Sequence, residues 1–295
     1  MRSLALTVLL LPTPAAAAAT QDRPADAAMK GYYDKAFTYY VDGDYPKAIE
    51  QWDMVLQEDP KQTTARNMID QARRKMAGSA GKLKDEFMGL VDRGRYQDAL
   101  LKLEELLATD PTNPYYLRAQ SRLQRIAGTV RASRRSAAWR AAEKGISAWV
   151  GEDEDLPFAY DALRYAKELA PAEKAFPRLI ADLERESPQL KLNDTKPPDT
   201  PVLEHKKDLA LQDIYDTKYY LAVKELEEVL RLAPDDLTAL KRLGSAYLQL
   251  KDYPRARRSW QKALRLSPGD DQLKQYLDAL DKLKRPAGVA AGNPG

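Results

Sequence analysis

The sequence predicts an all-α protein, a curved stack of about five helix pairs with additional helices between the pairs. Three features of the 295 residues lead to this prediction. One pattern recurs five times, with an alanine twelve residues before a proline. Large apolar residues flank each alanine at intervals of three and four, the spacing of one helix face. Small residues at shared positions let neighbouring helices approach closely. The alanines are Ala48, Ala99, Ala159, Ala222 and Ala256.

The chain begins with a segment typical of an export signal. A positive start precedes an apolar run at residues 3–11, which two prolines end, and small residues at 15–19 offer cleavage contexts. The apolar run is too short to cross a bilayer as a stable helix. We expect residues 1–19 to be a signal peptide and the mature protein to be periplasmic or secreted. The alternative is a disordered start without a targeting role, because the basic region is short.

Composition divides the remaining chain into two ordered blocks, 28–186 and 203–285. Residues 187–202 contain four prolines and few large apolar groups, so this stretch is expected to be a linker. The tail at 286–295 is rich in Gly, Ala and Pro and is expected to be disordered. No later segment approaches about 18 apolar residues, so we expect a soluble mature chain.

The repeats predict both helices of each pair. In the fifth repeat, Gly244 and Ala256 have almost no side chain, so the two helix axes can approach, and Tyr247 and Trp260 fill the flanking space. Pro254 stands in the first turn of the second helix, where its missing amide hydrogen costs nothing. The first repeat follows the same pattern, the second and fourth follow it well, and the third is the weakest.

The spacing of the repeats predicts extra helices. Only Ala222 and Ala256 are one bare repeat apart, at 34 residues. The longer steps leave room for helices at 63–76, 114–126 and 171–184, and residues 270–283 have the amphipathic pattern of a helix that caps the stack. We therefore expect roughly fourteen helices and no sheet.

These segments resemble tetratricopeptide repeats, the 34-residue helix–turn–helix unit with small residues at its helix contacts and a closing proline. The resemblance covers about 170 residues. It implies a solenoid whose inner helices line a concave groove for a partner protein. The positions that line the groove in this family fall here on Tyr33, Phe37 and Tyr40 in the first repeat, Lys84 and Met88 in the second, Lys207, Leu211 and Tyr215 in the fourth, and Lys241 and Leu248 in the fifth.

Lysine occupies the fifth position of four repeats, at Lys84, Lys144, Lys207 and Lys241. The resemblance then implies a ladder of ammonium groups, suited to an extended or helical peptide with acidic residues. The alternative is that these are solvated helix positions, because Lys is a good helix former. The aromatic residues of the first repeat also leave two interpretations open, a binding surface or packing under the N-terminal leader.

A departure from one subclass of the family is informative. Repeats that clamp the C-terminal carboxylate of chaperones carry asparagine at the ninth position of the inner helices. Here that position holds other residues, so capture of a chaperone tail is not expected. The ninth positions are Phe37, Met88, Ala148, Leu211 and Ser245.

A basic stretch runs from Arg118 to Arg140. Arg118, Arg122 and Arg125 follow one helix stripe, and the stretch could meet an anionic envelope surface. The alternative is a solvated face, in part paired with the acidic residues 152–155. Nucleic acid is not an expected partner, because the net charge is only +3.

Composition argues against most catalytic chemistry. There is no cysteine and a single histidine, His205, so thiol nucleophiles, serine–histidine triads and His-rich metal sites are nearly excluded. We expect no catalytic residues, no metal, no cofactor and no enzyme activity. The expected function is a protein-interaction scaffold of the cell envelope. The alternative is a self-assembling or accessory protein of outer-membrane, pilus, cell-wall or polysaccharide-export machinery, a link that rests on the fold alone.

Overall fold

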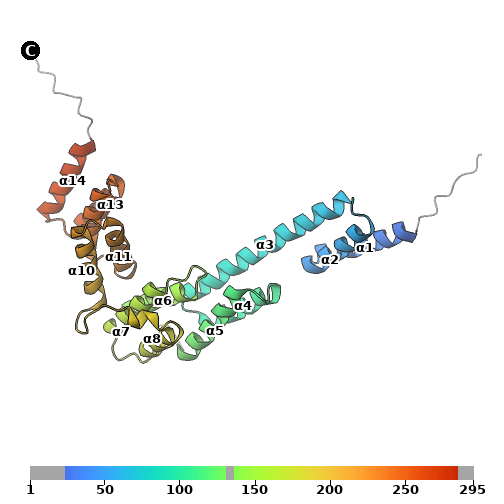
Figure 1. Cartoon of the computed structure of the whole chain (residues 1–295), viewed down its shortest axis with the longest axis horizontal. Helices are drawn as coiled ribbons and strands as arrows, with labels where there is room; N and C mark the ends of the chain where they lie inside the picture. Colours follow the sequence, from blue (N-terminus) through green and yellow to red (C-terminus); the bar gives the residue numbers. More distant parts are fainter. Residues whose placement is uncertain (1–23, 131–135, 285–295) are drawn as a thin grey trace, which may run out of the picture. The chain divides into compact units, whose positions relative to one another are not determined.

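A computed structural model describes residues 24–130 and 136–284 of the chain. Within these ranges the chain forms fourteen α-helices and no strand, which confirms the predicted all-α fold (Figure 1). None of the described helices has both the length and the apolar character needed to cross a membrane. The expected signal peptide at 1–19 and the expected tail at 286–295 lie outside the described residues.

The chain divides into two compact units, Met1–Lys82 and Leu83–Gly295, and the boundary lies inside α3. We call them the smaller and the larger unit. The smaller unit contains α1 (Pro24–Val41), α2 (Tyr45–Glu58) and the first part of α3 (Thr63–Asp92). The larger unit contains the rest of α3 followed by α4 (Tyr96–Thr109), α5 (Pro114–Thr129), α6 (Ala137–Val150), α7 (Leu156–Leu169), α8 (Ala175–Glu186), α9 (Gln189–Leu192), α10 (Val202–Tyr215), α11 (Tyr219–Leu232), α12 (Leu237–Gln249), α13 (Tyr253–Leu266) and α14 (Asp271–Lys284).

The five predicted helix pairs are present. Helix α1 packs on α2, α6 on α7, α10 on α11, and α12 on α13. The second part of α3 joins α4 in one core, and Glu86 of α3 pairs with Lys102 of α4 at 3.2 Å. All five repeat alanines are fully buried, as their role at helix contacts requires. They are Ala48, Ala99, Ala159, Ala222 and Ala256.

In four of the five pairs the turn contains one residue with a positive φ angle. Gly43 (φ 82°) and Gly94 (φ 69°) hold this position in the first two repeats. Thr217 (φ 60°) and Lys251 (φ 59°) hold it in the fourth and fifth. Glycine adopts this conformation without strain, whereas a side chain with a Cβ does not. The last two turns therefore carry backbone strain that the first two avoid.

Helix α3 differs from the prediction. A separate helix at 63–76 was expected before the second repeat, but one helix runs from Thr63 to Asp92. Residues 77–81 read Ala-Gly-Ser-Ala-Gly and contain no proline, so nothing in them forces the helix to end. Glycine lowers helix propensity by about 1 kcal/mol but does not break the hydrogen-bond ladder.

The other extra helices are confirmed with small shifts. Helix α5 begins at Pro114 as expected, with the Asn113 side chain accepting hydrogen bonds from two backbone amides of the first turn. Helix α8 begins at Ala175 instead of Pro171, because residues 171–174 form a turn. Helix α14 closes the stack, with Leu273 and Leu280 buried against the pair before it.

The proline-rich segment 187–202 packs against α7 and contains the short helix α9. The Val202 side chain is buried, and its backbone amide donates to the Glu168 carboxylate at 3.0 Å. Asp194 of this segment forms an ion pair with Arg164 of α7. The two compact units therefore do not coincide with the two blocks expected from composition.

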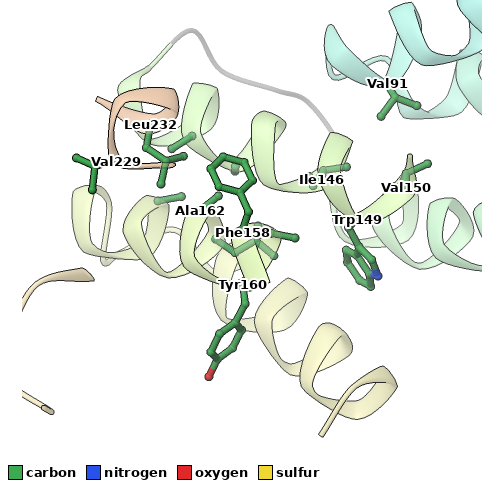
Figure 2. Packing of buried hydrophobic residues seen from close by; sticks show 14 of the residues in the cluster. Val91, Ile146, Trp149, Val150, Phe158, Tyr160, Ala162, Val229 and Leu232 are labelled. Atoms are coloured by element: carbon green, nitrogen blue, oxygen red, sulfur yellow. The ribbon is translucent and has the colours of Figure 1, made fainter. Parts of the chain in front are cut away.

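Each unit has its own hydrophobic core. The core of the larger unit runs from Phe87 to Leu280 without interruption at residues 187–202. Figure 2 shows Phe158 of α7 pointing into this core, with Val229 and Leu232 of α11 close to it. The core of the smaller unit contains fewer residues, which are Ala36, Ala48, Trp52, Val55, Ala65, Ile69 and Ala72.

Candidate interaction surface

One side of α1 presents apolar side chains that the smaller unit does not cover. We call Tyr33, Phe37, Tyr40 and Val41 the α1 face. Their spacing of four, three and one residues places them on one stripe of the helix. Phe37 is 42% exposed and Val41 is 82% exposed, whereas Tyr33 and Tyr40 are half-buried. Three of these four residues were predicted from the sequence. Val41 was missed, although its spacing from Phe37 would have indicated it.

The α1 face rests on the buried indole of Trp52. The ring centroids of Phe37 and Trp52 lie 5.9 Å apart, and those of Tyr40 and Trp52 lie 5.6 Å apart, both edge to face. Tyr33 stacks on Phe37 at 6.3 Å. Such aromatic pairs add about 0.5–1.5 kcal/mol beyond area burial. The indole Nε1 of Trp52 is buried and has no hydrogen-bond acceptor.

Basic side chains of α3 accompany this face in the same unit. The ammonium of Lys75 lies 5.7 Å from the ring centroid of Tyr40, within the range of a cation–π contact. Between residues 62 and 82 the chain has five basic side chains and one acidic side chain, all exposed. In the described part of the smaller unit, the one ion pair within 4.0 Å is Lys47–Asp44. The basic residues are Arg66, Arg73, Arg74, Lys75 and Lys82.

The predicted lysines of the larger unit have internal carboxylate partners. Lys84 pairs with Glu152, and Lys241 pairs with Asp270. Lys207 is buried and lies 2.8 Å from both Glu204 and Asp236. The hydrogen bond and charge of Asp236 raise the Lys207 pKa even though burial lowers it. Lys207 is therefore a structural residue and not an exposed step of a ladder.

Lys144 has a different environment. Its ammonium donates to the backbone carbonyl of Arg231. Burial, together with the charges of Arg140 and Arg231, lowers the Lys144 pKa. Three of the four lysines thus pair with internal carboxylates and the fourth, Lys144, bonds a backbone carbonyl, so neither a shared ladder nor simple solvation describes them all.

The remaining predicted groove residues lie in the larger unit and are unequal in exposure. Met88 is half-buried and accepts a hydrogen bond from the Tyr115 hydroxyl at 3.5 Å. Leu211 and Leu248 are half-buried in the core layer. Tyr215 is 77% exposed at the end of α10. These residues do not form a continuous apolar strip comparable with the α1 face.

The basic stretch from Arg118 to Arg140 is partly internal. Arg122 is buried, and its guanidinium contacts Glu154 at 2.6 Å as well as Glu186. Arg125 also pairs with Glu186, and Arg231 pairs with Asp155 at 3.1 Å. Residues 131–135 lie outside the described residues. Within the basic stretch, Arg122 is thus the arginine that pairs with the acidic run 152–155, through Glu154, and it is buried, whereas Arg125 pairs with Glu186 outside that run.

A buried ionic network that the sequence analysis did not predict joins α7, α10 and α11. The Lys206 ammonium contacts three carboxylates, Asp161 at 2.9 Å, Glu225 at 2.6 Å and Glu228 at 2.8 Å. Burial opposes the charge of Lys206, but the three carboxylates raise its pKa above the usual value. Burial raises the pKa of Glu228, although Lys206 acts against this shift. The network fastens the third repeat to the fourth.

The described residues contain no group of three or more His, Cys, Asp or Glu side chains placed to hold a metal ion. His205 lies beside a cavity of about 520 Å³ between α7 and α10, and its Nε2 is 3.3 Å from the Thr195 hydroxyl. The acidic groups of that cavity already pair with Arg122, Arg164 and Lys206.

One protein-family model matches part of the chain. The model of the tetratricopeptide repeat family matches residues 208–271, which extend from α10 to the start of α14. No curated protein sequence matches the chain.

Solved structures of tetratricopeptide repeat proteins are similar to the chain at low identity. The complex of the TPR2AB domain of yeast Sti1 with pHSP90 is 14% identical, with 87% of this chain and 84% of that chain covered and a TM-score of 0.27. A tetratricopeptide repeat protein from Parabacteroides merdae is 14% identical, with 86% and 99% covered and a TM-score of 0.25. At these TM-scores the superpositions carry no argument about function.

The family is generally a non-catalytic, protein-binding fold. The family match identifies tetratricopeptide repeats at residues 208–271, and the buried repeat alanines and helix pairs continue the same pattern through the other repeats.

Proposed function

We propose that the protein is a non-catalytic interaction scaffold whose partner docks on the α1 face. The observation that carries the proposal is the exposure of Phe37 and Val41 on α1, next to the side of the helix that packs through the buried Ala36. Exposed aromatic residues of this kind act as anchors in protein interfaces, because a partner gains by removing them from water.

The shape of the surface indicates the kind of contact. From Tyr33 to Val41 the α1 face extends over nine residues, or about 12 Å of helix for the eight steps of 1.5 Å between them. That length suits two turns of a partner helix or a short extended segment. An interface with two or three anchors of this size typically has a Kd in the micromolar range, about −8 kcal/mol.

We further propose that the scaffold acts in the cell envelope after export. Support comes from the signal-like composition of residues 1–19. Expression with residues 1–19 present, followed by sequencing of the mature N-terminus from the periplasmic fraction, tests this part. Retention of residues 1–19 on a cytoplasmic protein would contradict it.

Site-specific photo-crosslinking tests the docking surface. A crosslinking amino acid replaces Phe37 in one variant and Leu101 in the control, because Leu101 is a more exposed apolar residue (62%) on α4 of the larger unit. We expect an adduct of defined mass in intact cells from position 37 and not from position 101. Adding Val41→Asp to the first variant should remove it.

Two results would contradict this docking surface. Equal yields from both positions would mean that the α1 face has no preferred partner. An adduct of twice the chain mass would indicate self-association and favour the self-assembling alternative. Helix α14 already disfavours end-to-end stacking at the C-terminal side, because it buries Leu273 and Leu280 and turns charged residues to solvent.

A further inference from the structure

We infer that the segment docking on the α1 face is amphipathic and acidic, with apolar anchors for the face and carboxylates for the basic side chains of α3. This inference rests on the proposed function and adds the chemistry of the partner. It moves acid recognition from the lysines at the inner positions of the larger unit to a part of the molecule that the sequence pattern did not single out.

Two basic side chains of α3 are exposed and have no internal carboxylate partner in the described part of the chain. Arg74 and Lys75 are exposed, and Lys75 already lies against the Tyr40 ring of the α1 face. Among the described residues of the smaller unit, no carboxylate pairs with either side chain within 4.0 Å. A partner carboxylate therefore meets these cations without displacing an internal acid.

The predicted groove lysines of the larger unit, in contrast, already have carboxylate partners. There, a partner carboxylate would have to replace Glu152 at Lys84, Asp236 at Lys207 or Asp270 at Lys241. Such an exchange gains little, because one ion pair is broken for each one formed. Arg74 and Lys75 of α3 and the exposed apolar residues of α1 thus lie in one unit, whereas Lys84, Lys207 and Lys241 of the larger unit already have carboxylate partners.

The apolar and the basic residues of this surface lie on two different helices. The apolar residues come from α1 and the basic residues come from α3. A helix that binds an anionic membrane usually carries both kinds of residue on its own surface. Two helices that each supply one kind frame a strip, and an amphipathic segment with one apolar edge and one acidic edge fits such a strip.

The test uses two synthetic peptide sets that differ only in charge. Both sets are 14-residue amphipathic helices with Leu and Phe at the same positions, one with Glu and the other with Lys at the polar positions. Fluorescence anisotropy with the full-length protein gives their affinities. We expect the acidic set to bind at least about tenfold more tightly, with an affinity that falls as salt is added.

Variants locate the contact. Phe37→Ser should abolish binding of both sets, and Lys75→Glu should weaken the acidic set by about fivefold while improving the basic set. The control is Lys167→Glu, which reverses an exposed lysine of α7 in the larger unit and should leave both affinities unchanged. Far-ultraviolet circular dichroism checks that each variant keeps its helix content.

The outcomes separate the inference from the proposed function. If the basic set binds equally well and still depends on Phe37, the acidic partner is overturned while docking on the α1 face stands. If neither set binds but vesicles of phosphatidylglycerol do so in a Lys75-dependent way, the surface meets lipid and the inference is overturned. If the crosslink at position 37 is also absent, the proposed function itself fails.

Discussion

The first and the fifth repeat place a tryptophan at the same position and give it different surroundings. Trp52 and Trp260 both follow the repeat alanine by four residues. The Nε1 of Trp260 donates to the carbonyl of Lys241 at 3.1 Å, whereas the Nε1 of Trp52 has no acceptor. The residue at the eighth position explains the difference. A Cβ added to Gly244 would lie 2.3 Å from the Trp260 indole nitrogen, and the first repeat has Ala36 there. The alanine Cβ keeps Trp52 out of the equivalent place.

The same contrast extends to the two units. The smaller unit depends on aromatic packing around Trp52, and its one ion pair among the described residues, Lys47–Asp44, leaves Arg74 and Lys75 of α3 without carboxylate partners. The larger unit fastens its repeats with ion pairs such as those of Lys206, and with the guanidinium of Arg231 at 3.4 Å from the Phe158 ring centroid. A repeat whose charges and hydrogen bonds are satisfied internally is a structural repeat. A repeat that leaves them open has contacts left for a partner.

The largest expected effect comes from filling the space at Gly244. Gly244→Ala should lower the free energy of unfolding by about 3 kcal/mol, because it overpacks the helix contact and displaces the indole from its hydrogen bond. Thermal unfolding followed by circular dichroism measures the change. Gly128→Ala is the control, since no atom lies within 4 Å of a Cβ there, and it should be neutral or slightly stabilising. An equal loss in both variants would contradict the role of Gly244.

Removing different carboxylates from the ionic network of the larger unit should lower the free energy of unfolding by different amounts. Asp161→Asn should cost about 2 kcal/mol, because Asp161 serves both Lys206 and Arg164. Glu228→Gln should change stability by less than about 1 kcal/mol at neutral pH, because Lys206 keeps two other carboxylates. Urea unfolding of both variants gives the comparison, and a larger loss for Glu228→Gln would contradict this assignment.

The pH dependence of that comparison follows from the Glu228 pKa. Burial raises it above the usual value of 4.5, so the folded protein holds the proton more tightly than the unfolded chain. Ionised Glu228 therefore costs stability above its folded pKa, and this cost disappears as the pH falls through that pKa towards 4.5. Any advantage of Glu228→Gln over the natural protein at pH 7 should shrink over this window. An advantage that grows on acidification would contradict the raised pKa.

The middle of α3 should open more readily than the ends that enter the two cores. Gly78 and Gly81 have no neighbouring atom within 4 Å of a Cβ, and each costs a helix about 1 kcal/mol relative to alanine. Hydrogen exchange should be fast at residues 77–82, and Gly78→Ala with Gly81→Ala should slow it by on the order of tenfold. Unchanged exchange rates would mean that side-chain contacts, and not helix propensity, determine the stability of residues 77–82.

The smallest effect concerns the strained turns of the later repeats. Thr217→Gly should raise the free energy of unfolding by about 1 kcal/mol, because glycine relieves the positive φ angle of a β-branched residue. Lys251→Gly should gain less, since lysine is not branched at Cβ. Thermal unfolding of the two variants gives the ranking. A loss of stability in Thr217→Gly would show that its side chain contributes more than the strain removes.

Local signals explain why much of the fold could be predicted. The alanines at the helix contacts, Pro46 and Pro254 in first helical turns, and Gly43 and Gly94 in the turns act within a few residues of their own positions. The long helix α3 was missed because helix continuation between 76 and 83 depends on the absence of a breaker, which gives no positive signal in a sequence.

The candidate site depended on contacts that a sequence does not contain. Lys84 forms an ion pair with Glu152, which is 68 residues away in the sequence, and Lys207 pairs with Asp236, which is 29 residues away. Only the folded chain shows that these lysines already have carboxylate partners and that Lys75 forms no ion pair with a described residue. The aromatic residues of α1 could be placed from the repeat register, whereas their exposure could be judged only from the structure.

The indole resonances of the four tryptophans test the central claim most directly. Trp52 lies under the α1 face, whereas Trp139, Trp149 and Trp260 lie in the core of the larger unit. In ¹H–¹⁵N spectra of the full-length protein, the acidic amphipathic peptide should move the Trp52 indole signal, assigned with Trp52→Phe, and leave the other three in place. Movement of the Trp260 signal without the Trp52 signal would contradict docking on the α1 face.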